Sequence, residues 1–428
     1  MKFVLAANGS RGDVQPAVAL GLELARRGHE PVMLVPPNLV EFSAGTGLHT
    51  EIYGESTRDI LASDLVADGM HSRNPRTRLR AITELTVRGG RTMQQQLLDH
   101  TADADAIIAT SVGQERAHNV SRVRRIPHIP LHLCPIRRNR SVSMLAHVGV
   151  DAPPAIADLS WRVVEQVLWR ASRSAENILA GELGLPVIAQ PFATQIAKAG
   201  VPEIQAYDPA LFPRLTSQWG VARPLVGFLN LPAAYRAGVG DAPADDGLSA
   251  WIDNGDPPVY VGFGSMLPRN PDALAAAIRT AAAELDLRLL VAGGWSDFMS
   301  GMADARVRAV GHVDHDTVLP RCAAAVHHGG AGSLAAGLRA GLPTTIAWMG
   351  ADQPIWGRAL MKSHAGISFP MTRLDHARMT KALRLMRTAP VRAAAERIAN
   401  TLIRPARAVS AAADVAENAA LTSRQRTV

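Results

Sequence analysis

Residues 2–16 read KFVLAANGSRGDVQP, an apolar run that ends in a loop of glycine and polar residues. The run over 2–7 predicts a buried β-strand, and residues 14–27 predict a helix because their apolar residues recur on one face. Residues 31–35 predict a second strand. A strand, a helix and another strand in this order indicate a parallel sheet, so we expect the chain to begin with an α/β domain.

The same pattern continues along the chain and starts again after residue 255. In the first half, strands are expected over 106–110 and 128–133, and residues 231–255, rich in Ala, Gly, Pro and Asp, are typical of a linker. Beyond the linker we expect helices, a helical end over 378–420, and strands over 258–263, 287–291, 307–310, 324–327 and 344–347. This pattern predicts an α/β fold of two Rossmann-like β/α/β domains facing across a cleft, with ligands at the carboxyl ends of the strands.

The composition of the 428-residue chain excludes several classes of protein. Apolar residues make up 47% and charged residues 19%, which excludes a disordered chain, and no apolar stretch reaches the ~20 residues of a transmembrane helix. The apolar start is too short for a signal peptide. Cys134 and Cys322 form no disulfide or zinc pattern, so we expect a cytoplasmic protein. The net charge of +7 comes with only 4% aromatic residues, which argues against nucleic acid as a partner.

The densest chemical signal is the run HHGGAGS over residues 327–333, which follows an apolar strand and opens a helix. Glycines let a ligand approach the backbone, and the first N–H groups of a helix lack partners and favour negative charge. Because His328 and Ser333 add side-chain donors, we expect a diphosphate site. The alternative is a helix start whose glycines only permit tight packing. The run is no Walker A loop, since no Gly-Lys-Ser/Thr follows, and Ala335 replaces the third glycine of a dehydrogenase loop.

Three further loops follow predicted strands. In the loop over 9–16, Asp13 is either a helix N-cap or a catalytic carboxylate, and the spacing alone does not separate the two. The loop GFGSM over 262–266 offers a second approach to phosphate. In GADQP, over 350–354, an acid and an amide are suited to hold several sugar hydroxyls, with an N-cap as the alternative for the acid.

Together these motifs resemble those of glycosyltransferase family 1, two-domain (GT-B) enzymes that include bacterial antibiotic, glycopeptidolipid and sterol glycosyltransferases and plant natural-product ones. The resemblance covers nearly the whole chain and is strongest in GSRGDVQP (9–16), VYVGFGSM (259–266), GHVDHDTVLPRCAAAVHHGGAGS (311–333) and GADQP (350–354). It implies an inverting transfer of a hexose from a nucleotide diphosphate sugar to an acceptor hydroxyl, with neither a metal nor another cofactor.

The resemblance also implies a division of the chain. Residues 1–228 would bind the acceptor, 229–255 would link the domains, 256–390 would bind the nucleotide sugar, and 391–428 would be helices that cross back to the first domain. Asp13 matches the general base. The residues that match the family's donor contacts are Ser10, Gly12, Ser265, His312, Val313, His328, Gly330, Ala331, Gly332, Ser333, Asp352 and Gln353.

The donor contacts fall into three groups by what they would touch. The diphosphate is expected to meet His328, Gly332 and Ser333, with Ser10 and Ser265 beside them. The base ring is expected between His312 and Val313, and the sugar hydroxyls at Asp352 and Gln353. Plant members carry a Glu for the ribose where this chain has Ala336, so both uridine and thymidine nucleotides remain open.

Other readings stay open at this point. Acid pairs with the spacing of a metal site occur at Asp103/Asp105 and Asp314/Asp316. A nucleotide-sugar epimerase or a sugar phosphorylase would share the two-lobed fold. A non-catalytic homologue would bind the nucleotide sugar without turning it over.

The acceptor is expected to be a small lipophilic molecule or a lipid-linked one. Residues 35–42, VPPNLVEF, look like the bacterial branch that acts on bulky lipophilic aglycones such as glycopeptidolipids, macrolides or sterols. Arginine-rich segments at 70–91 and 137–140 would form a basic rim that attracts an anionic membrane surface. We therefore expect peripheral association with the inner face of the membrane through this rim.

Overall fold

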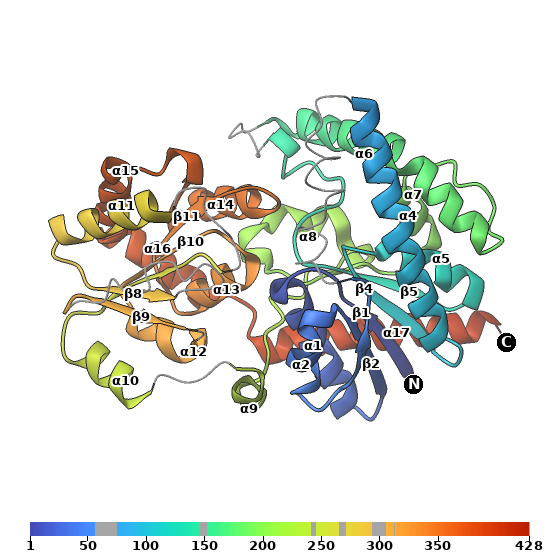
Figure 1. The fold of residues 1–428 in the computed structure, drawn as a ribbon, viewed down its shortest axis with the longest axis horizontal. Coiled ribbons are helices and arrows are strands. Elements are labelled where there is room, and N and C mark those ends of the chain that lie inside the picture. Colours follow the sequence, from blue (N-terminus) through green and yellow to red (C-terminus); the bar gives the residue numbers. More distant parts are fainter. Residues whose placement is uncertain are drawn as a thin grey trace.

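A computed structural model describes residues 1–55, 75–145, 152–240, 245–264, 271–292, 305–311 and 313–427. Two parallel six-stranded sheets organise the chain, one in each half (Figure 1). The first, in the order β3-β2-β1-β4-β5-β6, contains β1 (Lys2–Ala6), β2 (Glu30–Val35), β3 (His49–Ile52), β4 (Ala106–Thr110), β5 (His128–His132) and β6 (Ile204–Gln205). The second, in the order β12-β11-β10-β7-β8-β9, contains β7 (Val259–Gly262), β8 (Leu289–Ala292), β9 (Val307–Val310), β10 (Ala324–His327), β11 (Thr344–Trp348) and β12 (Gly366–Pro370).

These two sheets confirm the predicted pair of Rossmann-like domains. The strand order reverses between β1 and β4 in the first sheet and between β7 and β10 in the second. In open parallel sheets, ligands bind beyond the carboxyl ends of the strands where the order reverses. The loops after β1, β7 and β10 therefore stand where a ligand is expected.

Helices cover the faces of both sheets. Those of the first half are α1 (Arg11–Arg26), α2 (Val40–Ala44), α4 (Pro75–His100), α5 (Gln114–Arg124), α6 (Pro154–Glu182), α7 (Phe192–Ala199) and α8 (Pro213–Trp219). Those that follow are α9 (Ala233–Arg236), α10 (Asp246–Asp253), α11 (Pro271–Glu284), α12 (His315–Val318), α13 (Ala331–Arg339), α14 (Gln353–Lys362), α15 (His376–Met386), α16 (Ala389–Thr401) and α17 (Pro405–Thr427). The predicted linker over 231–255 thus contains two helices, α9 and α10. Leu248 and Ile252 of α10 pack into the core of the second half, which explains the second of these helices.

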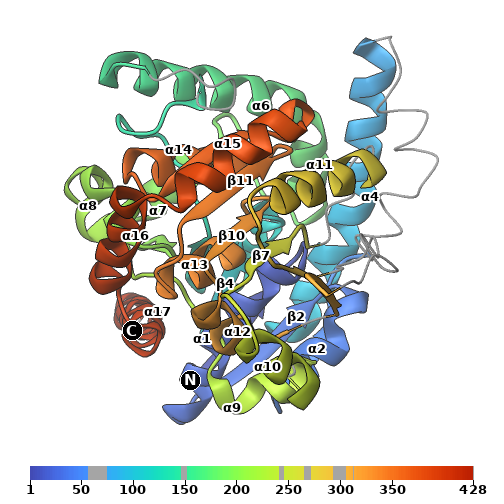
Figure 2. The same ribbon diagram turned by 90° about the vertical axis from the view of Figure 1, so that its left-hand side faces the viewer.

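The last helix returns to the first half, as the resemblance implied. Ala408, Ala412 and Ala416 of α17 are buried in the same apolar cluster as α1 and β1. Such small side chains let α17 lie close against α1. In Figure 1 the red C-terminal helix lies along the first half, and its end is close to the chain's N-terminus. Figure 2 shows the same arrangement from the side.

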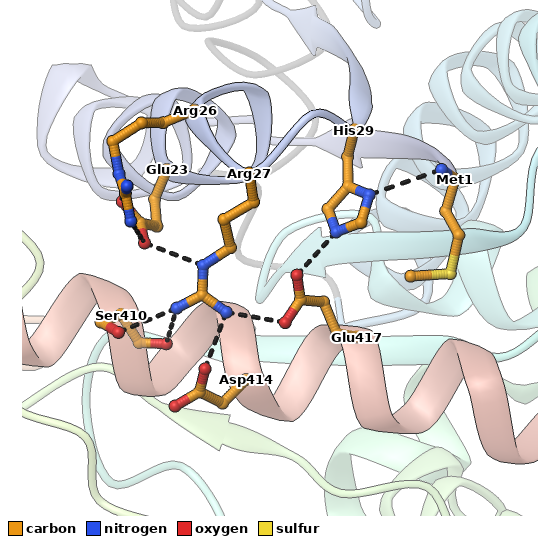
Figure 3. A network of polar contacts seen from close by, with 8 residues as sticks. All are labelled: Met1, Glu23, Arg26, Arg27, His29, Ser410, Asp414 and Glu417. Carbon is orange, nitrogen blue, oxygen red and sulfur yellow. Dashed lines mark hydrogen bonds and ion pairs between the residues drawn. The ribbon is translucent and has the colours of Figure 1, made fainter.

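A polar network at the end of α1 holds α17 in place (Figure 3). The Arg27 guanidinium donates from Nη1 to the carboxylates of Asp414 and Glu417, both at 2.7 Å, and from Nη2 to Ser410 Oγ at 2.8 Å. His29 Nε2 lies 2.6 Å from the second oxygen of Glu417. These bonds fix the register of α17 against α1, because each requires a particular turn of the helix.

The two halves also share an apolar cluster. Trp356 of α14 is fully buried, and its ring contacts Tyr207, Phe212 and Phe228 of the first half at centroid distances of 5.9, 5.5 and 5.9 Å. This contact brings the start of α14 up to the first half.

Candidate functional site

The loop after β1 holds Asp13 in a defined position. Ser10 is the N-cap of α1, and Asp13 Oδ2 accepts hydrogen bonds from Ser10 N at 2.8 Å and from Ser10 Oγ at 3.0 Å. Gly9 has a φ of +126°, and a Cβ on it would lie 2.4 Å from Asp13 Oδ2, so the loop needs glycine there. One oxygen of Asp13 therefore closes the helix start from the third helical position, and the N-cap is Ser10 rather than Asp13. Oδ1 has no hydrogen-bond donor among the described residues.

The environment of Asp13 includes side chains from both halves. Burial raises the pKa of Asp13 above its usual range, the hydrogen bonds from Ser10 oppose this, and the carboxylate of Asp352 raises it further. Burial also raises the pKa of the Cys134 thiol, with contributions from the Asp352 and Asp13 carboxylates. The three groups come from α1, from the loop after β5, and from the residue before α14. Their mutual influence shows that Asp13 lies where the two halves meet.

The N-terminus of α13 is open. Gly330 is its N-cap, Ala331 its first residue, and the side of Gly332 is free of other atoms within 4 Å of a built Cβ. The N–H groups of residues 331–333 have no partner within the helix, which is the usual state of a first turn. Gly329 has a φ of +93°, and a Cβ there would lie 2.6 Å from Ile346 Cγ2. The turn itself therefore requires a glycine at position 329, whereas no neighbouring atom would exclude a side chain at position 332.

The two histidines before α13 are neutral at pH 7. Burial lowers the pKa of His327 to about 3, and His327 Nδ1 accepts the Gly329 N–H at 2.9 Å. Burial lowers the pKa of His328 to about 4, against the effect of its hydrogen bond to the Gly262 backbone. His328 Nδ1 is buried and has no described hydrogen-bond partner. An unpaired buried nitrogen is costly, so the arrangement suits a ligand group that bonds to it.

Asp352 and Gln353 lie at the start of α14, each with part of its side chain already engaged. Asp352 Oδ2 accepts the Trp356 Nε1 proton at 2.7 Å. Gln353 is buried, and its Oε1 accepts from Met349 N at 2.7 Å and from Gly350 N at 3.3 Å. Gln353 therefore holds its own loop through oxygen, and a bound sugar would meet its Nε2.

The predicted site residues fall into four groups. Ser10, Gly12 and Asp13 lie together at the start of α1. The set at α13 is His328, Gly330, Ala331, Gly332 and Ser333, and the set at α14 is Asp352 and Gln353. Val313 packs in part against the core of the second half beside α12. Ser265 and His312 lie outside the described residues.

Two residues of this candidate site, Cys134 and Trp356, were not identified from the sequence. Cys134 lies near Asp13 and Asp352, and nothing in its sequence context signals that position. Trp356 orients Asp352, and its position four residues later, one helical turn on, was the available signal.

The acid pairs considered as metal sites are held by basic groups. Asp314 accepts from Arg236 Nη1 at 3.1 Å, and Asp316 accepts from Asn230 at 2.6 Å and from Arg339 at 2.7 Å. In the other pair, Asp103 lies 2.6 Å from the Lys2 ammonium. Across the described ranges, no group of three or more His, Cys, Asp or Glu side chains could hold a metal ion.

The expected basic rim differs from the structure at Arg137. Its side chain is 5% exposed and donates from Nε to Glu203 Oε2, so Arg137 is an interior ion-pair partner. Buried arginines need such a partner, which explains the difference. Residues 70–74 of the rim lie outside the described residues. No described helix is long and apolar enough to cross a membrane.

Comparisons with known proteins agree on one family. The N-terminal domain of glycosyltransferase family 28 matches residues 3–116, and the C-terminal domain described as erythromycin biosynthesis protein CIII-like matches residues 277–417. An uncharacterised glycosyltransferase of Mycobacterium tuberculosis is 36% identical over 425 residues, which cover 99% of this chain and 100% of that protein. The chain belongs to the GT-B glycosyltransferases. This membership confirms the predicted fold and enzyme class.

More distant members of the family show the range of the fold. A sterol 3-beta-glucosyltransferase of Arabidopsis thaliana is 29% identical over 420 residues, covering 94% of this chain and 63% of that protein. The solved glycosyltransferase of kitacinnamycin has a TM-score of 0.72 at 18% identity, with 98% of both chains covered. The glycosyltransferase VinC, solved in complex with dTDP, has a TM-score of 0.66 at 19% identity, with 98% of this chain and 100% of that chain covered. At such identities the two structures establish the fold.

Proposed function

We propose that this GT-B glycosyltransferase moves a hexose from a dTDP- or UDP-sugar to a hydroxyl group of a lipophilic natural product or glycolipid, with inversion at the anomeric carbon. Asp13 is the general base in this proposal. The observation that carries it is a carboxylate in the first turn of the helix that follows β1, with Oδ2 held by Ser10 at 2.8 and 3.0 Å and Oδ1 without a described donor. A carboxylate beside the start of α14 can reach an acceptor hydroxyl if Asp352 holds the donor sugar.

The reaction needs a base on one face of the sugar and a leaving group on the other. Asp13 takes the proton of the attacking hydroxyl through the oxygen that Ser10 leaves open. A positioned base of this kind contributes roughly 10²- to 10⁴-fold to a rate. Because burial raises the pKa of Asp13, its carboxylate is a stronger base than an exposed one.

The leaving nucleoside diphosphate gains charge as the glycosidic bond breaks. In the proposal, the free N–H groups at the start of α13 stabilise that charge, since fixed donors cost no reorganisation during the reaction. His328 lies directly before these donors as a neutral imidazole and so adds no negative charge beside the leaving diphosphate. Such donors supply the stabilisation that a metal gives elsewhere. The acid pair at Asp314 and Asp316 stays with its arginines.

The nature of the substrates rests on the relatives. The dTDP complex of VinC supports a thymidine nucleotide, and the sterol glucosyltransferase supports a glucosyl donor and a lipophilic alcohol. The structure of Asp352 and Gln353 suits a hexose, because a carboxylate and an amide offer both acceptor and donor to neighbouring hydroxyls.

Product analysis tests this function. The purified protein is incubated with dTDP- and UDP-hexoses, a panel of lipophilic alcohols that includes a sterol, and a chelator of divalent cations. We expect a glycosylated acceptor by mass spectrometry and, by NMR, a β-linked product from an α-linked donor. An epimerised donor without acceptor, a retained configuration, or a strict need for a divalent cation would each contradict the proposal.

A further inference from the structure

Helix α6 turns a row of apolar side chains to solvent. Ile156, Leu159, Val163 and Val167 are 46%, 56%, 53% and 57% exposed. Their spacing of three, four and four residues places them on one face of the helix, over a length of ~17 Å. Trp161, on the opposite side, is buried against the first half. Monomeric proteins seldom leave such a row uncovered unless it meets a partner or a lipid surface.

The charged residues beside this row are arginines. Arg162, Arg170 and Arg173 are exposed and lie next to the apolar row on the outward face. Arg170 and Arg173 line an open hollow together with Asn177 and Ile178. Neither of these two arginines has an acidic partner among the described residues. The hollow thus offers two free guanidinium groups, the geometry that suits a phosphate oxygen.

The acids of α6 do not offset this charge. Asp158 lies in ion pairs with Arg138 and Arg162, and Glu182 pairs with Arg91. Glu176 is buried and pairs with the buried Arg116. Glu165, the remaining acid, lies on the inward side and is partly buried. Within the described part of the chain, the outward face of α6 therefore combines apolar side chains with unopposed positive charge.

The position of α6 leaves this face accessible along its length. Both views place α6 at the upper edge of the first half, above the sheet and on the same side as α14 (Figures 1 and 2). An apolar row flanked by arginines is the pattern of a helix that lies in the plane of an anionic membrane surface. A protein partner would be expected to need acidic groups facing these arginines, whereas anionic lipids present phosphate uniformly.

We propose that the outward face of α6 is a membrane-docking surface that binds bilayers rich in anionic phospholipid. Ile156, Leu159, Val163 and Val167 enter the boundary between headgroups and acyl chains, and Arg170 and Arg173 contact lipid phosphates. This docking surface consists of α6 residues and adjoins the expected basic rim, whose Arg91 and Arg138 pair with acids of α6. Its binding does not depend on glycosyl transfer.

Vesicle binding without any substrate tests the proposal. The full chain is mixed with vesicles of phosphatidylcholine alone or of phosphatidylcholine with phosphatidylglycerol, and the bound fraction is measured by flotation. We expect binding to the anionic vesicles only, weakened by added salt. The double variant Leu159→Glu/Val163→Glu, and separately Arg170→Gln/Arg173→Gln, should each weaken binding about tenfold or more.

A matched control is Leu421→Glu, which places the same charge at another apolar residue, 47% exposed, on α17. It should bind vesicles as the unaltered protein does, and all variants should keep the circular dichroism spectrum of the folded chain. The proposal is overturned if the unaltered protein binds neither vesicle, or if the α6 variants bind as tightly as it does. It is equally overturned if the α6 row proves to hold two copies together, seen as a dimer that the double variant splits and that binds no vesicles.

Discussion

At the scale of single residues, Asp13 closes the start of its helix, and in our proposal the same carboxylate is the general base. Its Oδ2 closes the start of α1 through Ser10, and its Oδ1 is left for other chemistry. A carboxylate held by one oxygen keeps a fixed orientation, which a general base requires. This arrangement buries the Asp13 carboxylate and brings it under the influence of a second carboxylate, Asp352. Both effects disfavour the charged form of Asp13, and its pKa is raised for that reason.

The raised pKa leads to a prediction about stability. A group whose pKa is raised by folding favours the protonated state, so its contribution is lost as the pH rises through that pKa. Once the pH exceeds the pKa of Asp13, its charge therefore lowers the free energy of unfolding, and Asp13→Asn should raise it. Denaturant titrations should show this gain at pH 7 and a smaller gain toward pH 4. A variant less stable than the unaltered protein at pH 7 would contradict the prediction.

At the scale of elements, the start of α13 is shaped for something other than its own packing. Gly332 lies in the first turn of a helix, where a glycine costs stability and no neighbour requires one. The contrast with Gly329, which the turn itself needs, separates a structural glycine from one that only the proposed diphosphate site would require.

Gly332→Ala should move stability and donor affinity in opposite directions. The added methyl group meets no atom of the protein, so stability should stay equal or rise by up to ~1 kcal/mol. A diphosphate close to the backbone would collide with it, so affinity for dTDP or UDP should fall about tenfold, worth ~1.4 kcal/mol. Thermal unfolding and calorimetric titration measure the two effects. Gly329→Ala, in contrast, should destabilise the fold, and unchanged nucleotide binding by Gly332→Ala would refute the assignment.

Arg27 stabilises the packing of α17 against α1 more than the neighbouring surface charges do. Arg27→Leu removes the bonds to Asp414, Glu417 and Ser410 and leaves Asp414 without a described partner, so we expect a loss of about 2 kcal/mol in the free energy of unfolding. Arg26→Leu is the matched control, since Arg26 is exposed and pairs only with Glu23 within α1. Urea titration of both variants measures the difference. Equal losses would show that the network does not hold α17.

At the scale of the whole molecule, the contact between the halves and the site share one residue. Trp356 fills the apolar cluster between the halves with its ring and holds Asp352 with its indole N–H. Trp356 thereby links the packing of the two halves to the orientation of the Asp352 carboxylate, whose charge raises the pKa of Asp13. The proposed docking of α6 acts at the same scale, because it would place the first half, which is expected to bind the acceptor, against a lipid surface.

Trp356→Phe separates these two roles. The ring contacts with Phe212 and Tyr207 are largely kept, but Asp352 loses its hydrogen-bond donor. We expect kcat/KM for the donor sugar to fall about tenfold, the loss of one hydrogen bond to a charged group, with a small change in melting temperature. Phe212→Leu should show the reverse: a lower melting temperature with donor kinetics unchanged. Unaltered donor kinetics in Trp356→Phe would show that Asp352 does not need this bond.

Local patterns in the sequence predicted the central strands and the loops that follow them. β1, β7 and β10 are buried, mostly apolar runs with a glycine at the end of the strand or within three residues of it, and such runs can be recognised from neighbouring residues. The strands that the prediction missed, β3, β6 and β12, lie at sheet edges. β6 has two residues and β3 carries His49 and Glu51, so neither shows an apolar period.

Local sequence patterns also predicted part of the candidate site. The residues at α1, α13 and α14 lie in strand-to-helix loops, which sequence patterns reveal. The approach of Asp13 to Asp352 and Cys134 depends on how two domains pack, which no local pattern contains. The engagement of Gln353 Oε1 with its own loop and the burial of Arg137 depend on tertiary neighbours in the same way.

The proposed reaction depends most on a proton acceptor in one half that works on a donor held by the other. The direct measurement is turnover and donor affinity of Asp13→Asn, side by side with Asp375→Asn, an N-cap aspartate of α15 that is distant in sequence from the proposed site. We expect Asp13→Asn to lose at least a hundredfold in kcat while its Kd for the nucleotide sugar stays within about twofold of the unaltered protein. Asp375→Asn should keep normal turnover. Full turnover by Asp13→Asn would contradict the account.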